Sequence, residues 1–193
     1  MKIVRIATLT LLLVSVQALA HEEGEGHAGF LVGLLHPALG LDHLLAMLSV
    51  GILSAQIGGR AMWSVPLTFV VVMTIGAIIG ANNIQIPLVE SGIALSVVAL
   101  GIALAADKNM AVVWAMIFVS FFAIFHGHAH GTEMPDVGNA LLYGVGFVLG
   151  TSIIHLAGVL IGVISKRIPK GPVLLRFSGA AIAVIGLTML FGV

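Results

Sequence analysis

Six long apolar segments joined by short connections dominate this chain of 193 residues and leave few folds open to it. Only 8% of its residues are charged, against roughly 25% in a typical soluble protein. A helix needs about 20 apolar residues to cross a bilayer, and most of the segments have that length. We therefore expect an all-α membrane protein, a compact bundle of six transmembrane helices within residues 28–193. The expected spans are Ala28–Ala55, Met62–Ala81, Ile86–Ala106, Ala111–His126, Val137–Ser165 and Val173–Phe191.

Residues 1–20 have the composition of a secretory signal peptide. Two basic residues precede a short apolar run that ends in the small-x-small pattern Ala18-Leu19-Ala20. The run is too short to span a membrane comfortably, so we expect cleavage rather than retention as a first helix. Residues 21–27 then form an acidic tail outside the cytoplasm that begins with His21. This tail is either simply solvated or captures metal, because a terminal amine beside an imidazole is a good chelator.

The basic residues of the connections predict the orientation in the membrane. With the mature amino terminus outside, the inner connections contain Arg60, Lys108, Lys166, Arg167 and Lys170, whereas the outer segments contain only acidic charges. Basic residues favour the cytoplasmic side of a membrane. We expect a multi-pass protein of the bacterial inner membrane with both mature termini in the periplasm.

Charge and cysteine content exclude several functions. Eight Lys and Arg residues balance eight Asp and Glu residues, so the chain offers no basic surface to a nucleic acid. The absence of cysteine excludes thiolate metal sites and cysteine catalysis. The sequence contains no Gly-x-x-x-x-Gly-Lys-Ser/Thr motif, so no nucleotide-binding site is expected.

The first expected span carries the motif His36-Pro37-x-x-Gly40-x-Asp42-His43. Titratable groups are costly inside a membrane and usually have a function there, and imidazole with carboxylate ligates divalent transition metals. His36 and His43 share a helix face to within roughly 20°, whereas Asp42 points about 100° away in a regular helix. Pro37 removes a backbone donor and Gly40 loosens the next turn. We therefore expect the helix to be broken here, which would let the three ligands converge.

A second motif, Phe125-His126-Gly127-His128-Ala129-His130-Gly131-Thr132-Glu133, follows at the outer end of the fourth span. Histidine-rich tracts bind metal, and three histidines within five residues favour that function over a structural role. The alternation does not fit one helix face, and the glycines favour an irregular mouth. His126 and His130 are the better ligands by position, and Glu133 adds a carboxylate. His128 either binds metal as well or faces water.

Two residues outside the motifs have open roles. His155 lies within the fifth span at a depth like that of His43. It either completes a deep metal site or is a hydrogen-bonded core histidine. Glu90, near the outer end of the third span, is an outer ligand or, as we favour, an interfacial charge.

Small-residue spacings recur along the chain. Gly29-x-x-x-Gly33, Gly76-x-x-x-Gly80, Gly146-x-x-x-Gly150 and Gly158-x-x-x-Gly162 permit close helix packing, which we expect to be within one chain. A three-plus-three inverted repeat is a further possibility, because spans one and four run oppositely and both carry histidine motifs.

Together the two histidine motifs resemble those of the HupE/UreJ family, bacterial nickel or cobalt permeases associated with hydrogenase and urease gene clusters. The similarity extends over the whole chain, from the signal peptide through six spans and both motifs. The resemblance implies inward transport of nickel or cobalt as a passing ion, with no permanently bound cofactor and no enzymatic activity. The residues it implies are His36, Asp42 and His43 in the first motif and His126, His130 and Glu133 in the second.

The expected route begins at the His21 tail and the second motif, passes the first motif and ends near the basic inner connections. The membrane potential, an ion gradient or a partner protein would drive the transport. Two other classes of function stay open at this point. A zinc-dependent intramembrane hydrolase would use His and Asp ligands to hold a zinc ion that activates water. A membrane metal sensor would bind the ion without moving it.

Overall fold

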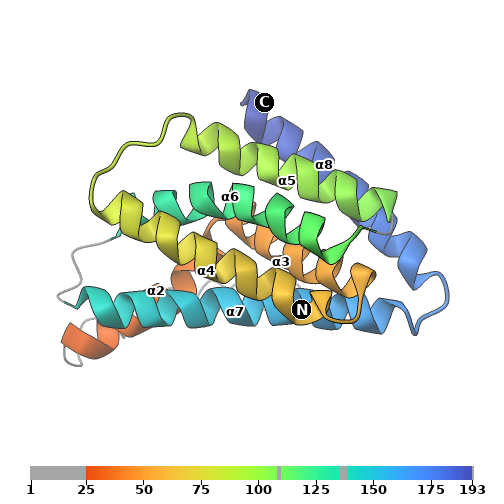
Figure 1. Ribbon diagram of the computed structural model, residues 1–193, viewed down its shortest axis with the longest axis horizontal. Helices are drawn as coiled ribbons and strands as arrows, with labels where there is room; N and C mark the ends of the chain where they lie inside the picture. The colour runs from red at the N-terminus through yellow and green to blue at the C-terminus, as the bar shows by residue number, and fades with distance from the viewer. Residues whose placement is uncertain (1–24, 108–109, 135–138, 193) are drawn as a thin grey trace, which may run out of the picture.

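The computed structural model describes residues 25–107, 110–134 and 139–192, with side chains described from Gly29 onward. Within these residues all the regular structure is helical, as expected, and the helices pack into one bundle (Figure 1). The helices are α2 (Glu25–Leu39), α3 (Leu41–Ile57), α4 (Ala61–Ala81), α5 (Val89–Ala106), α6 (Val112–Thr132), α7 (Ala140–Ser165) and α8 (Gly171–Phe191).

The first span is broken inside its histidine motif, as the sequence predicts. Helices α2 and α3 meet at an angle of 81°, and the break lies at Gly40, whose backbone is extended. Pro37 is accommodated in the last turn of α2. The carboxylate of Asp42 accepts a hydrogen bond from the backbone N–H of His43, in the first turn of α3, at 2.7 Å. The motif therefore forms a bent element with its titratable residues on both sides of the bend.

Five helices, α4 to α8, are each long and apolar enough to cross a membrane, and the α2–α3 pair adds a sixth span when it is counted as one broken helix. Large apolar side chains such as Leu67, Ile117, Leu160 and Phe177 are exposed along them, as expected for surfaces that face lipid. The protein is a multi-pass membrane protein.

Close helix pairs build the bundle. Helix α4 packs on α6, α5 packs on α8, and α7 packs on both halves of the broken span (Figure 1). Glycines allow these approaches. A Cβ at Gly76 would lie 2.5 Å from a carbonyl oxygen of α6, and one at Gly146 would lie 2.1 Å from a carbonyl oxygen of α2. These three pairs have the symmetry of a three-plus-three repeat. If each of the first three spans is exchanged with its counterpart among the last three, the α4–α6 pair becomes the pair of α7 with the broken span, and the α5–α8 pair is unchanged.

The fourth span is longer than predicted, and this part of the prediction is wrong. Helix α6 continues through the whole second motif to Thr132, rather than ending at His126 in an irregular mouth. A Cβ at Gly127 would lie 1.9 Å from the carbonyl oxygen of Met73, and one at Gly131 would lie 2.1 Å from that of Ala77. The two glycines bring α6 close to α4. They do not loosen the backbone.

The other predicted spans agree with the helices to within three residues at the ends that are described. The predicted start of the fifth span at Val137, the signal peptide and His21 lie outside the described residues. Residues 25–27, which were expected in the amino-terminal tail, already belong to α2.

Candidate metal centre

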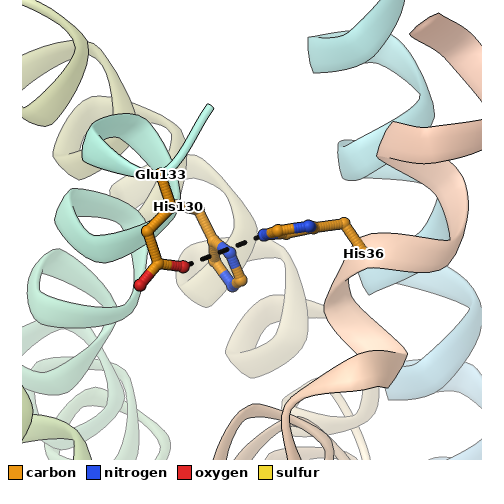
Figure 2. Close-up of side chains that lie close together, drawn as sticks. All are labelled: His36, His130 and Glu133. Carbon is orange, nitrogen blue, oxygen red and sulfur yellow. Dashed lines mark ion pairs between the residues drawn. The ribbon is translucent and has the colours of Figure 1, made fainter. Parts of the chain in front are cut away.

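The end of the bundle that we expect to face the periplasm holds a group of three potential ligands, which we call the outer cluster: His36, His130 and Glu133. His36 projects from the last turn of α2 toward His130 and Glu133 at the end of α6 (Figure 2). One ligand atom from each residue lies within 4.8 Å of the other two, and His36 Nε2 is 4.0 Å from a carboxylate oxygen of Glu133. Among the described residues this is the one set of three with such spacing. The two motifs, more than eighty positions apart, thus meet at one site.

A second group of imidazoles, His43 and His126, lies deeper in the bundle, and we call it the inner pair. The Nδ1–H of His43 donates to the carboxylate of Asp42 at 2.8 Å, so the other nitrogen, Nε2, carries the lone pair. This Nε2 atom is buried and has no hydrogen-bond partner in the part of the chain that the structure describes. His126 is fully buried one helical turn from His130, and its ring centroid lies 4.6 Å from that of His43. Asp42 therefore orients a nitrogen that is free to bind a metal, although Asp42 itself belongs to no group of three with ligand spacing among the described residues.

His130 connects the two groups. Its ring centroid is 4.9 Å from that of His36 and 4.2 Å from that of His43. Both of its ring nitrogens are buried and lack a hydrogen-bond partner among residues 25–107, 110–134 and 139–192. Four imidazoles, His36, His130, His43 and His126, therefore form a continuous row from the outer cluster to the centre of the protein.

His155 lies beyond the end of this row. Its Nδ1–H donates to the carbonyl oxygen of Thr151 at 2.9 Å, which leaves a buried Nε2 without a partner. The ring of Phe69 stands between His126 and His155, at centroid distances of 5.7 and 5.1 Å. Both roles considered for His155 therefore stay open. Its Nδ1 is hydrogen-bonded to the backbone, as in a core histidine, and its Nε2 is free to complete a deep metal site.

Two other candidates lie apart from the row. His128 is buried rather than facing water, and its Nε2–H donates to the carbonyl oxygen of Ile84 in the connection after α4, at 2.8 Å. Glu90 is exposed in the first turn of α5. Among the described residues no hydrogen bond or ion pair involves it.

Three residues that line this region were not identified from the sequence. Tyr143 is 3% exposed, and its hydroxyl has no hydrogen-bond partner among the described residues. The centroid of its ring lies 5.9 Å from that of His36. Phe69 separates His126 from His155, and Ser96 contacts the His126 ring at 2.8 Å. A single Ser, Phe or Tyr in an apolar helix has no local signature, because only the packing of distant helices brings it to the site.

The fold and this site define a class: a multi-pass membrane protein with a row of imidazoles running from one end of the bundle into its interior. The sequence matches the family described as HupE / UreJ protein over residues 9–189. It is 43% identical over 187 residues to Protein HupE of Rhizobium leguminosarum bv. viciae. The aligned region covers 96% of this chain and 97% of that protein. No solved structure gives a significant match.

The chain belongs to the HupE/UreJ family, a family of nickel and cobalt transporters. The resemblance drawn from the two motifs is confirmed. Membership in a transporter family argues against the hydrolase alternative.

Proposed function

We propose that this protein imports nickel or cobalt ions across the bacterial inner membrane along the row of imidazoles. One observation carries the proposal: His36, His130 and Glu133 place ligand atoms within 4.8 Å of one another, although they come from two separate motifs. Imidazole and carboxylate suit nickel and cobalt, and geometry and availability, rather than raw affinity, decide between such metals.

The outer cluster captures the ion. The side chain of Glu133 is 58% exposed and that of His36 is 22% exposed, so a hydrated ion can reach both. The carboxylate supplies a negative charge that attracts a divalent cation. The tail that begins at His21 raises the local metal concentration on the same side of the membrane.

The ion then moves along the row by ligand exchange. Among the described residues neither ring nitrogen of His130 is held by a hydrogen bond, so either one can carry the lone pair that binds the ion. Its ring contacts both groups, and it can therefore receive the ion at the outer cluster and pass it to the inner pair. The Asp42 carboxylate keeps the Nε2 lone pair of His43 available and contributes a negative charge near the inner pair. Beyond Phe69, His155 provides the next nitrogen toward the inner end.

Release occurs toward the cytoplasm. The predicted orientation places Lys166, Arg167 and Lys170 at the inner end. Lys166 donates to the backbone oxygen of Ala55 at 2.7 Å, which fixes a positive charge at the end of α3. An inward-moving divalent cation gains roughly 4–5 kcal/mol per 100 mV of membrane potential, so the potential alone can drive uptake.

The experiment is uptake of nickel and of cobalt, each at nanomolar level, into cells that express the intact protein, its His36→Ala variant or its Leu35→Ala variant. Leu35 is the matched control, because it precedes His36 on α2 and its partly exposed side chain carries no ligand. We expect accumulation in the wild type and in Leu35→Ala, and its loss in His36→Ala. Competition between the two metals ranks them.

Absence of accumulation by well-expressed wild-type protein would refute the proposal. Metal analysis and lipid-hydrolysis assays of the purified protein would then test the hydrolase and the sensor. Equal uptake by wild type and His36→Ala would refute the role of the outer cluster and leave transport itself standing.

A further inference from the structure

We infer that Ser96 is a positioning residue that fixes the tautomer of His126, so that His126 binds the transported ion through Nδ1 and not through Nε2. The inference deepens the proposed function and rests on it for the part that concerns the ion. Ser96 lies on α5, a helix that contributes no histidine to the row of imidazoles.

The contact between the two residues is short and completely buried. The Ser96 hydroxyl donates to the carbonyl oxygen of Ile93, one turn earlier in α5, at 2.6 Å. The Nε2 atom of His126 lies 2.8 Å from the same hydroxyl oxygen. Neither residue has any exposed surface.

The positions of the hydrogens follow from these two bonds. A serine hydroxyl has one hydrogen, and we assign it to the bond with the Ile93 carbonyl oxygen, which cannot donate and lies closer, at 2.6 Å, than His126 Nε2 at 2.8 Å. The hydroxyl oxygen must therefore accept from His126, which places the ring hydrogen on Nε2. In a neutral imidazole the other nitrogen, Nδ1, then carries the lone pair. That atom is buried and has no partner among the described residues.

A buried acceptor without a partner is costly, and a passing cation would satisfy it. His43 has the opposite arrangement: its Nδ1–H donates a hydrogen bond to the Asp42 carboxylate, and Nε2 carries the lone pair. The two residues of the inner pair therefore bind the ion through different nitrogens, Nε2 in His43 and Nδ1 in His126. In each ring, the hydrogen bond to the other nitrogen decides which one carries the lone pair. Partners that orient a ligating histidine in this way typically change metal affinity by roughly 10–100-fold when they are removed.

The first test reads the tautomer in the metal-free protein. Nitrogen-15 NMR of the purified, detergent-solubilised wild type distinguishes protonated from unprotonated ring nitrogens, and the His126→Ala variant assigns the signals. We expect His126 to carry its hydrogen on Nε2 in the wild type and in Ser96→Thr, which keeps the hydroxyl. In Ser96→Ala we expect a mixture of tautomers.

Hydrogen on Nδ1 in the wild type would overturn the inference, whether or not the protein transports metal. This measurement uses unaltered protein, so it stays decisive even if Ser96→Ala fails to fold.

The second test is nickel binding by titration calorimetry of the same proteins, with Ser54→Ala as the matched control. Ser54 is also fully buried and donates to a carbonyl oxygen three residues earlier, at 2.7 Å, but it forms no hydrogen bond with a histidine among the described residues. We expect Kd to rise roughly 10–100-fold in Ser96→Ala, to stay near wild type in Ser54→Ala, and to be largely restored in Ser96→Thr.

A folded Ser96→Ala protein with wild-type Kd would overturn the inference. Equal weakening in Ser54→Ala would also overturn it, because any buried serine would then have the same effect. If the wild type binds no nickel or cobalt, the proposed function fails, and the role of His126 as a ligand fails with it. The NMR result would still decide whether Ser96 sets the tautomer.

Discussion

The outer cluster and the inner pair contain similar ligands but hold them differently. In the outer cluster three ligand atoms are already within 4.8 Å, and Glu133 remains 58% exposed. In the inner pair His43 and His126 are each tethered through one ring nitrogen and are nearly or fully buried. No set of three ligand atoms with that spacing forms around them among the described residues. In the function that we propose, the preassembled outer cluster captures the ion, and the single fixed ligands of the inner pair bind it weakly enough to let it go, as conduction requires.

Replacing His130 tests the link between the two groups and has the largest expected effect. His130→Ala removes the ring that contacts both His36 and His43, so the row is interrupted. We expect uptake of nickel to fall more than the roughly 10–100-fold typical of residues that only support a ligand.

The control for this variant is His128→Ala, on the same helix and equally buried, but hydrogen-bonded to Ile84 instead of lying in the row. It should lower stability while most uptake per folded molecule remains. If His128→Ala stops uptake as completely as His130→Ala does, His128 is a ligand as the sequence predicts, and our description of the row must change.

Asp42→Asn tests whether the inner pair governs movement rather than capture. The side-chain amide of this variant can still accept the hydrogen bond from His43 Nδ1–H, but it places no negative charge beside the His43 ring or the passing ion. We expect the maximal rate of nickel uptake to fall roughly 10-fold or more, with a smaller change in KM.

Asp107→Asn is the matched control, because Asp107 lies at the inner end of α5 with φ of 47°, a conformation that Asn adopts as readily as Asp. Its kinetics should equal those of the wild type. A normal maximal rate in Asp42→Asn with a raised KM would place Asp42 in capture and would remove the distinction between the two groups.

The sequence predicted the features that depend on a single segment. Apolar run lengths gave the six spans, and Pro37 with Gly40 marked where the first span bends. Position in the second motif also favoured His126 and His130 as ligands; α6 presents them one turn apart, and their binding of metal stays a prediction.

Features that depend on contact between distant segments could not be predicted in this way. The glycines of the second motif were interpreted as loop residues because nothing in the sequence shows the carbonyls of α4 against which they pack. Ser96 and Phe69 belong to helices without a histidine motif, and the site becomes visible only when α5 and α4 are placed beside α6. The relative positions of His36 and Glu133 likewise required the packed structure.

Gly127→Ala tests whether close packing of α6 on α4 supports the inner pair. The added methyl group would lie 1.9 Å from the Met73 carbonyl oxygen, so the two helices must separate. Overpacking of this kind costs typically about 1–3 kcal/mol, and the melting temperature in detergent should drop accordingly.

Gly144→Ala is the control, because no atom lies within 4 Å of the position of its added methyl group. It should leave stability unchanged or raise it slightly, since alanine favours a helix over glycine. Unchanged stability and nickel affinity in Gly127→Ala would show that the helices separate freely and that the fixed spacing has no part in holding the inner pair.

Glu133→Gln tests capture by the outer cluster and has the smallest expected effect. The carboxylate is more exposed than buried, so water and salt screen its attraction for the ion. We expect KM for nickel to rise up to roughly 10-fold at low ionic strength, with an unchanged maximal rate. The difference from wild type should shrink as salt is added, because the Debye length falls from about 30 Å at 0.01 M to about 10 Å at 0.1 M. A lower maximal rate that high nickel does not restore would mean that Glu133 acts after capture, and the outer cluster would then belong to the transfer step that we assign to the inner pair.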